Sequence, residues 1–396
     1  MFCSPFFRLA ASPRGHCLRM PSPKNAAMSR KLNALSLFSG AGGLDLGFHN
    51  TGAVQTLACY EFNELFSETL RLNRHKLSAD PTMSLPAIHQ EDLSKSETIS
   101  RMASLYEGVD IVFGGPPCQS FSIMGKKGGT SDPRGALIFS FSKIISSLRP
   151  RCFLFENVPN FASIDAGMPA RELHKELCEI GYSTWCGILC AADYGAYTFR
   201  RRFFILGVLG NTQVAPPVPT HLASHQSTLP TLDISPWKKC GDVFDSIESW
   251  LSRGKPLLNH EEVRHSKEVV ERFSGLKFGE TDNVRKRNRL DPGKPAHSIY
   301  VGGVTGKLQA RPHIHPFYPR ELTARECVAI QGFPLDWQFM GRADAVMLQA
   351  ANAVPVQLAE ALARHLVALL HKQKQRPKAY AAHELRAPPP SDHGVK

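Results

Sequence analysis

Short apolar runs alternate with stretches of helical spacing through the first half of the chain. The apolar runs are short and rich in β-branched or aromatic residues, as in buried strands, and they lie at 32–38, 54–60, 84–89, 109–113, 152–155, 184–189 and 203–208. Helical spacing falls between them, from Leu44 onward and at 62–73, 136–147 and 170–180. Strands that alternate with helices predict an α/β fold, with a parallel sheet and helices on both of its faces.

Residues suited to chemistry follow five of these strands, and they are Gly40, Glu61, Asp92, Cys118 and Glu156. Open α/β sheets bind ligands outside the carboxyl ends of their strands, so we expect these five residues to gather at one edge. The first strand runs through a glycine-rich turn at 39–43 into a helix. Nucleotide-binding βα units begin in this way.

Cys118 stands in the run Gly-Gly-Pro-Pro-Cys-Gln-Ser-Phe-Ser at 114–122, directly after a predicted strand. The glycines end the strand, and the two prolines fix φ in the loop that follows. The thiol is therefore expected on a stiff loop at a strand end, where a nucleophile fits. A free cysteine in an ordinary Gly/Pro turn is the alternative that this run leaves open.

The chain changes character after Gly210. Residues 211–236 are rich in Pro, Thr, Ser and His, which marks a boundary. The stretch up to Pro319 has short turns and little periodicity, which predicts a separate small lobe. Helical spacing returns at 320–330 and 353–370, and the basic, Pro-rich segment from Gln373 is expected to be disordered.

The net charge of +12 is concentrated in one stretch of the chain. Residues 253–320 hold fourteen Lys or Arg against seven Asp or Glu, which is more than half of the excess. Basic residues cluster at 285–289, and Phe278 and Tyr300 lie nearby in the sequence. This pattern favours a nucleic-acid surface over a solvated basic face.

Membrane and metal proteins are disfavoured by the sequence. No apolar run approaches the ~18–20 residues that a membrane span needs. The ten cysteines have no Cys-x-x-Cys spacing, so neither a zinc site nor a disulfide framework is indicated, and a reducing, intracellular compartment fits best.

Residues 1–34 carry six Lys or Arg and no acid. A transit peptide, a disordered basic arm and a leader upstream of a start at Met28 all remain open for this segment.

Six motifs, in one order, resemble those of DNA cytosine-C5 methyltransferases of the bacterial restriction-modification type, which use S-adenosylmethionine. The matching segments are 38–43, 116–119, 156–158, the pair Arg200 and Arg202, 320–334, and 352–355. The likeness covers about 33–208 and again 318–368. It implies a Rossmann-like S-adenosylmethionine-dependent methyltransferase sheet with a second, smaller target-recognition domain.

The resemblance and the boundaries together imply five segments. They are a basic, disordered leader at 1–31, a catalytic and cofactor-binding domain at 32–210, a small target-recognition domain at 211–344, a segment returning to the catalytic domain at 345–372, and a disordered tail at 373–396.

The reaction that the resemblance implies is methylation of cytosine C5 within a specific duplex DNA sequence. The Cys118 thiolate would attack C6 of a cytosine flipped out of the duplex. Glu156 would donate a hydrogen bond to N3 and accept one from the exocyclic amine, which requires a raised pKa. Arg200 and Arg202 would steady the base and a phosphate beside Cys118.

S-adenosylmethionine would bind at the glycine-rich loop. Gly40, Gly42 and Gly43 would let the backbone approach the methionine part closely. Glu61 would accept both ribose hydroxyls, and Asp92 would accept from the adenine amine. The remaining expected cofactor contacts are Phe38, Leu44, Pro116, Asn352 and Val354.

Double-stranded DNA is the implied partner, and its expected contacts are Gln119, Ser122, Arg285, Lys286, Arg287 and Arg289. We expect a monomer that needs neither a membrane nor a metal. It would work in the bacterial cytoplasm, associated with the nucleoid through DNA. A cognate restriction endonuclease that acts independently is a candidate partner. The target sequence is not predicted, because base readout depends on side-chain geometry.

Three residues depart from the family pattern: Thr198 stands in place of Gln, Tyr197 in place of Pro or Ala, and Ala351 in place of Gly. They remove no catalytic atom, but they bear on the position of the arginines and on closure of the cofactor site.

Two alternative functions remain. A tRNA cytosine-C5 methyltransferase of the same type usually carries Cys-Phe-Thr in its recognition lobe, which this chain lacks. A protein with the methyltransferase fold that binds DNA or a partner without turnover is disfavoured, because Cys118 and Glu156 are both present.

Overall fold

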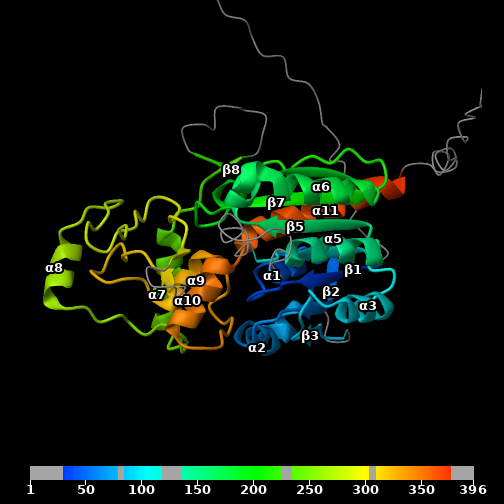
Figure 1. Ribbon diagram of the computed structural model, residues 1–396. Coiled ribbons are helices and arrows are strands. Elements are labelled where there is room, and N and C mark those ends of the chain that lie inside the picture. Colours follow the sequence, from blue (N-terminus) through cyan, green and yellow to red (C-terminus); the bar gives the residue numbers. More distant parts are fainter. Residues whose placement is uncertain (1–29, 79–83, 118–135, 224–233, 303–308, 376–396) are drawn as a thin grey trace, which may run out of the picture. The chain divides into compact units, whose positions relative to one another are not determined.

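The structure is a computed structural model, and it describes residues 30–78, 84–117, 136–223, 234–302 and 309–375. The chain divides into two units, Met1–Lys31 and Leu32–Lys396, and every element below belongs to the second. Seven strands form one sheet in the order β3-β2-β1-β4-β5-β7-β6 (Figure 1). They are β1 (Leu32–Leu37), β2 (Val54–Tyr60), β3 (Ala87–His89), β4 (Ile111–Gly114), β5 (Cys152–Asn157), β6 (Tyr182–Cys190) and β7 (Arg201–Leu209).

The sheet is mixed, so the predicted parallel sheet is confirmed for β1 to β5 and was wrong at one end. Strands β1 to β5 pair in parallel, whereas β7 is antiparallel to both β5 and β6. The connection from β6 to β7, residues 191–200, contains only the short 3-10 helix η4 (Ala191–Tyr194). Parallel strands need a longer crossover, usually with an α-helix, so this pair can only run antiparallel.

Helices cover both faces of the sheet, as predicted (Figure 1). One face packs against α1 (Gly43–Asn50) and α11 (Val356–Gln375). The other packs against α3 (Ser96–Leu105), α5 (Ala136–Leu148) and α6 (Met168–Glu179). Helix α2 (Glu64–Asn73) follows β2, and further 3-10 turns are η1 (Arg74–Leu77), η2 (Pro159–Ala162) and η3 (Ile164–Gly167). Neighbouring side chains of a strand enter opposite cores, because their directions alternate along the strand.

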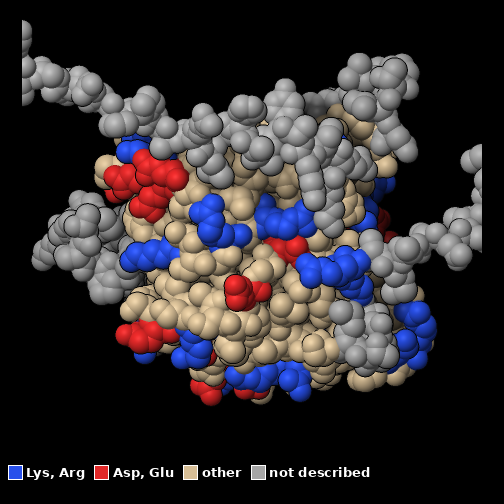
Figure 2. Space-filling view, turned by 90° about the vertical axis from the view of Figure 1, so that its right-hand side faces the viewer, with Lys and Arg blue, Asp and Glu red and all other residues tan. Residues whose placement is uncertain are grey.

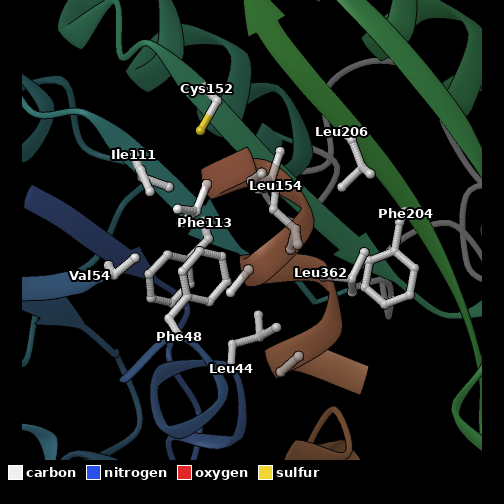
Figure 3. Packing of buried hydrophobic residues seen from close by; sticks show 14 of the residues in the cluster. Leu44, Phe48, Val54, Ile111, Phe113, Cys152, Leu154, Phe204, Leu206 and Leu362 are labelled. Carbon is white, nitrogen blue, oxygen red and sulfur yellow. The ribbon is translucent and has the colours of Figure 1, made fainter. Parts of the chain in front are cut away.

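Helix α1 lies close against the sheet and against α11. The rings of Phe48 and Phe113 stack with their centroids 3.9 Å apart, and Figure 3 shows them beside Val54 and Leu44 in one core. A Cβ atom on Gly47 would lie 2.3 Å from the Cβ of Ala359, so α1 and α11 can approach this closely only with glycine there. This packing fixes where the first turn of α1 stands.

The part of the chain after β7 contains more regular structure than the sequence predicted. Helices α7 (Gly241–Ser252) and α8 (Lys267–Ser274) lie in the stretch for which little periodicity was expected. The remaining elements are the pairs β8 (His221–Leu222) with β9 (Ser235–Pro236) and β10 (Tyr300–Gly302) with β11 (Gln309–Arg311), and the helices α9 (Ala324–Ile330) and α10 (Ala343–Asn352). Residues of α7, α9 and α10 share one buried core.

Helix ends differ from the predicted ones for local reasons. Helix α9 begins at Ala324 rather than at 320, because Thr323 and Glu326 form a capping box. Helix α11 begins at Val356, directly after Pro355, and it continues to Gln375, past the expected start of the tail. Helix α10 was not predicted.

One stretch, Ala343–Gln373, is long and apolar enough by composition to cross a membrane. In the structure it consists of two helices, α10 and α11, and 67% of its most apolar window is buried within the protein. Its apolar residues therefore belong to the core of this fold.

Candidate active site and cofactor site

The carboxyl ends of the parallel strands meet at one edge of the sheet. In the strand register Leu37 lies beside both Tyr60 and Gly114, Tyr60 beside His89, and Gly114 beside Phe155. The residues that follow these positions include Phe38, Glu61, Gly115 and Glu156. The strand ends thus place the glycine-rich loop, Glu61 and Glu156 on the same edge.

The glycine-rich loop has a backbone shape that depends on its residue types. Phe38, Gly40 and Gly42 have positive φ angles of 51°, 57° and 90°. A Cβ on Gly42 would lie 3.1 Å from side-chain atoms of both Leu70 and Trp337. Beside Gly40, by contrast, no heavy atom lies within 4 Å of the position of a Cβ, so this side of the loop is open among the described residues.

The C-terminal segment packs directly beneath this loop. A Cβ on Gly43 would lie 2.6 Å from the carbonyl oxygen of Val354, so residue 43 must be glycine for this approach. Val354 is buried, and Asn352 is exposed at the last position of α10. The Leu44 side chain lies in the core of the sheet, so this residue can offer a ligand only its main chain.

Glu61 joins the end of β2 to the glycine-rich loop. Its Oε2 accepts from the backbone N–H of Gly40 at 2.8 Å, and its Oε1 accepts from that of Asn63 at 2.8 Å. Burial raises the pKa of this carboxyl, although both backbone hydrogen bonds oppose the shift. Asp92 accepts from the backbone N–H of Ser94 at 2.9 Å through Oδ1.

Phe62 was not singled out from the sequence. Its side chain is 70% exposed, directly after Glu61. An exposed aromatic ring directly after a strand-end acid is suited to stacking on a flat base. Its sequence signal is an aromatic residue that directly follows a strand-end acid.

Glu156 and Arg202 form a buried ion pair at the end of β5. Arg202 Nε lies 2.9 Å from Glu156 Oε1, and the two side chains are 10% and 12% exposed. Burial raises the pKa of Glu156, and the charges of Arg202 and Arg200 oppose that shift without cancelling it. The carboxyl therefore holds a proton more readily than an ordinary glutamic acid.

The chain that leads to Cys118 is held against Glu156. A Cβ on Gly115 would lie 2.3 Å from Glu156 Oε2, so a larger residue there would displace the Glu156 carboxyl. The Asn157 side chain donates from Nδ2 to the carbonyl oxygen of Pro116 at 3.1 Å. Cys118 follows two residues later but, like Gln119 and Ser122, lies outside the described residues.

Arg200 is fully buried and does not join the Glu156 pair. Its Nη1 donates to the carbonyl oxygen of Ile299 at 2.8 Å, and its Nη2 donates to that of Ala351. It therefore ties the start of β7 to two segments far along the chain. Thr198, one of the departures from the family pattern, is also buried. Its backbone forms an isolated β-bridge with Ala296 in the same region.

The four predicted basic DNA contacts have different surroundings. Arg289 donates to the carbonyl oxygens of Pro316, at 2.9 and 3.1 Å, and of Leu276, at 2.7 Å, so its guanidinium is used inside the lobe. Nη1 of Arg285 and Nε of Arg287 lie 3.3 and 3.6 Å from the same oxygen of Glu321. Lys286 is exposed, with a positive φ of 53°. Arg285 and Lys286 are thus the two exposed residues of the four.

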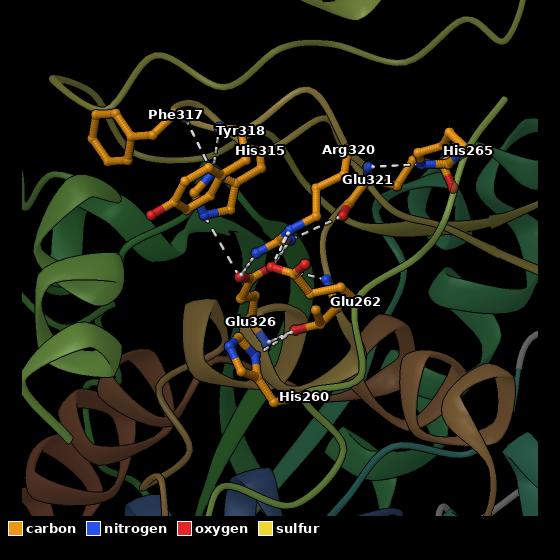
Figure 4. Close-up of polar contacts among 10 residues, drawn as sticks. His260, Glu262, His265, His315, Phe317, Tyr318, Arg320, Glu321 and Glu326 are labelled. Carbon is orange, nitrogen blue, oxygen red and sulfur yellow. Dashed lines mark hydrogen bonds and ion pairs between the residues drawn. The ribbon is translucent and has the colours of Figure 1, made fainter. Parts of the chain in front are cut away.

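A buried polar network not predicted from the sequence holds the loop before α9. Arg320 donates to both carboxylate oxygens of Glu326, at 2.8 and 2.9 Å, and to Glu262 at 3.1 Å (Figure 4). Nδ1 of His315 accepts from the backbone N–H groups of Phe317 and Tyr318, each at 3.1 Å. Phe317 and Tyr318 themselves are half-exposed. The Thr-x-x-Glu spacing at 323–326 was the sequence signal for part of this network.

Positive charge is not confined to residues 253–320. Figure 2 shows the face that lies to the right in Figure 1, where Lys and Arg gather near the middle with Asp and Glu between them.

Among the described residues, no group of three or more His, Cys, Asp or Glu is placed to hold a metal ion.

Comparison with known proteins identifies the class. The family model of the C-5 cytosine-specific DNA methylase matches residues 32–368. The type II methyltransferase M1.HphI of Haemophilus parahaemolyticus is 31% identical over 367 residues, which are 88% of this chain and 90% of that protein. M.DdeI of Desulfomicrobium norvegicum is 29% identical over 381 residues, covering 85% and 88% of the two chains. The chain therefore belongs to the C-5 cytosine-specific DNA methylase family.

Solved structures agree with this assignment. A protein described as a prophage-encoded DNA modification methyltransferase from E. coli has a TM-score of 0.66 at 25% identity, covering 86% of this chain and all of that one. The Dnmt2 methyltransferase of S. pombe has a TM-score of 0.60 at 18% identity, over 87% of this chain and all of that one, and this likeness shows the fold alone.

The predicted family, fold class and enzyme class are thus confirmed. The protein methylates C5 of cytosine in DNA in a restriction-modification context, and methyltransferases of its class use S-adenosylmethionine.

Proposed function

We propose that this enzyme acts through a covalent intermediate between Cys118 and C6 of a cytosine that is flipped out of duplex DNA. C5 of cytosine is a poor nucleophile while its electrons belong to an aromatic ring. Addition of the thiolate at C6 forms the Sγ–C6 bond and leaves C5 enamine-like. S-adenosylmethionine would supply the methyl group for C5 and leave as S-adenosylhomocysteine. The C5 proton then passes to a base such as hydroxide, the Sγ–C6 bond breaks, and Cys118 leaves as the thiolate.

Glu156 is the proposed acid that assists this addition. Negative charge builds at N3 of the ring when sulfur adds to C6, and a hydrogen bond from a protonated carboxyl stabilises it. The supporting observation is the buried pair of Glu156 and Arg202 at 2.9 Å, with Gly115 beside it at the entrance to the Cys118 loop. We assign Arg202 the role of orienting Glu156, and Arg200 the role of holding β7 to the segments that contain Ile299 and Ala351.

Base flipping is proposed because a cytosine stacked in a duplex does not expose C6 to a side chain. Extrusion costs a few kcal/mol, which contacts to the flipped base and to the phosphates must offset. We place the phosphate contacts on Lys286, Arg285 and Arg287, with Gln119 and Ser122 near the base. Arg289 holds the surrounding loops, since its donors are used by Pro316 and Leu276.

The residues at the sheet edge fit S-adenosylmethionine. The open side of Gly40, the carboxylate of Glu61 and the exposed ring of Phe62 lie on consecutive parts of one edge. Glu61 would accept the ribose hydroxyls, Asp92 the adenine amine, and Phe62 would stack on adenine. The remaining contacts, mostly through main chain, are assigned to Phe38, Gly42, Gly43, Leu44, Pro116, Asn352 and Val354.

The wider setting follows from this assignment. We propose that the protein acts as a monomer on double-stranded DNA in the cytoplasm, at the nucleoid, with an independent restriction endonuclease as its cognate enzyme. We keep 211–344 as the target-recognition domain and 345–372 as the segment that returns to the catalytic domain.

Transfer of a labelled methyl group tests the proposed function. Duplex DNA and tRNA are offered separately, and the modified position is mapped by bisulfite sequencing. We expect label in duplex DNA, at C5 of cytosines within one short sequence, and none in tRNA. Cys118→Ser should abolish transfer while S-adenosylmethionine binding stays within about twofold. Label in tRNA alone, or undiminished transfer by Cys118→Ser, would contradict the proposal.

A further inference from the structure

Asp45 is a fully buried acid in the first turn of α1, two residues after the glycine-rich loop. Among the described residues its Oδ2 has no hydrogen-bond partner. Burial raises the pKa of this carboxyl to about 6, against the hydrogen bonds from Ser36 and Cys59. A carboxyl with one unpaired oxygen destabilises a core, since its desolvation is not compensated.

Asp45 contacts a strand that ends at the cofactor edge. The thiol of Cys59, in β2, donates to its Oδ1 at 3.2 Å. Cys59 directly precedes Tyr60, the last residue of β2. Asp45 therefore links α1 to β2 at a buried point just behind the end of that strand.

From the end of β2 the contacts continue into the loop. The carbonyl oxygen of Tyr60 accepts from the backbone N–H of Ser39 at 3.1 Å, and the Ser36 hydroxyl, in β1, donates to Ser39 Oγ at 2.8 Å. The next backbone N–H, of Gly40, donates to Glu61 at 2.8 Å. The Asp45 carboxyl is thus joined, through Cys59 and the end of β2, to the loop and to Glu61.

A side chain that costs stability but supports a site is expected where function requires it. An apolar residue at position 45 would fill the same space without a buried charge, but it would leave the Cys59 thiol without this acceptor. The first turn of a helix also favours an acidic side chain, because the backbone N–H groups there are unpaired. Full burial and the contact with Cys59 distinguish Asp45 from an acid that merely caps a helix at the surface.

We propose that Asp45 is a positioning residue for the cofactor loop, holding the end of β2 so that the Gly40 N–H and the Glu61 carboxylate face the same ligand. This inference rests on the proposed cofactor role of that loop. Asp45 does not touch the ligand, so its loss should weaken S-adenosylmethionine binding while leaving the chemical step nearly intact.

Asp110 provides a matched control. It is also a buried aspartate, but it precedes β4, at the opposite end of the strands. Its Oδ2 accepts from the backbone N–H of Asn33 at 3.0 Å, and its Oδ1 lies 3.3 Å from Nη1 of Arg151. Asp110→Asn should therefore lower the thermal midpoint and leave the cofactor loop unaffected.

The experiment measures the Kd for S-adenosylmethionine by calorimetry, kcat at saturating cofactor and DNA, and the thermal midpoint at pH 8. For Asp45→Asn, which replaces a charge-assisted hydrogen bond from Cys59 by a neutral one, we expect a Kd about fivefold higher and a kcat within about twofold of the wild type. Its thermal midpoint should not fall, because the substitution removes a buried charge. Cys59→Ala, which removes the donor to Asp45, should raise the Kd in the same direction, and it carries the test if Asp45→Asn does not fold.

Each result decides a separate point. A wild-type Kd in Asp45→Asn, or in Cys59→Ala where only that variant folds, overturns the inference. So does a rise in Kd that Asp110→Asn matches, because the effect would then follow from general destabilisation. Glu61→Ala tests the cofactor site directly: if it binds S-adenosylmethionine as the wild type does, the proposed site fails and this inference fails with it.

Discussion

Arg202 donates from Nε to Oε1 of Glu156 at 2.9 Å, and this pair stands between the end of β5 and the chain that leads to Cys118. The arginine opposes the effect of burial on the pKa of Glu156, and the pKa stays raised. A carboxyl in this balance can hold a proton for N3 of a cytosine and still keep a fixed orientation. The pair links the fold to the proposed chemistry, and the first prediction concerns it.

Replacing Glu156 by Gln should lower kcat by about 10²- to 10⁴-fold, the usual contribution of a positioned general acid. Gln keeps the shape but cannot give a proton to the ring. Single-turnover methyl transfer is the measurement. Arg201→Ala is the control, since Arg201 is the exposed neighbour of Arg202 and should leave kcat unchanged. A kcat within threefold of the wild type for Glu156→Gln would remove the acid from the mechanism.

Gly115→Ala should displace the Glu156 carboxyl, because the new Cβ would lie 2.3 Å from Oε2. We expect kcat to fall at least tenfold, since small displacements of catalytic groups are costly. The free energy of unfolding should also fall by about 1–3 kcal/mol, because the new Cβ overpacks the site. Gly275→Ala is the control, because its Cβ would meet only atoms at 3.6 and 3.8 Å. Equal kinetics for the two variants would show that Gly115 does not hold this geometry.

Lys286→Ala should affect DNA binding, whereas Arg289→Ala should affect the stability of the fold. Lys286 is exposed, so its loss should weaken binding to all DNA sequences and flatten the salt dependence of log K by about 0.9 per phosphate contact. Arg289 donates to Pro316 and Leu276, so its loss should instead lower the free energy of unfolding by about 1–3 kcal/mol. Binding and urea unfolding of both variants separate the two roles. An effect of Lys286→Ala on one sequence only would mark a base contact instead.

Stability should fall as the pH drops from about 6.5 towards 4. Burial lowers the pKa of His315 to about 4, and its Nδ1 accepts two backbone N–H groups, so the folded protein resists protonation while the unfolded chain does not. The loss amounts to about 3 kcal/mol at most for this residue. His315→Asn offers an oxygen in place of Nδ1 that does not titrate, and it should reduce the slope of unfolding free energy against pH. His371→Asn, at an exposed position, should leave that slope unchanged.

Much of the site follows from the sequence because it depends on strand ends. Glu61 and Glu156 end apolar runs, and the parallel register brings those ends together without any knowledge of packing. The antiparallel pairing of β6 and β7 was missed because apolar runs carry no strand direction. Its signal was the short connection at 191–200.

The roles of the arginines could not be predicted in the same way. Sequence shows that Arg200 and Arg289 are charged, but their partners are backbone carbonyls of distant segments, such as Ile299 and Pro316. Such contacts depend on the tertiary fold and leave no local pattern. The buried state of Asp45 was hidden for the same reason, since an acid in the first turn of a helix is ordinarily exposed.

The central claim is that the sulfur of Cys118 bonds to C6 of the target cytosine. Duplex DNA with 5-fluorocytosine at the methylated position tests it, because fluorine at C5 cannot leave as a proton does and the adduct persists. With S-adenosylmethionine present, the wild type should form a complex that survives denaturing electrophoresis, and Cys118→Ser should form none. No adduct with the wild type, or one that persists in Cys118→Ser, would contradict this account.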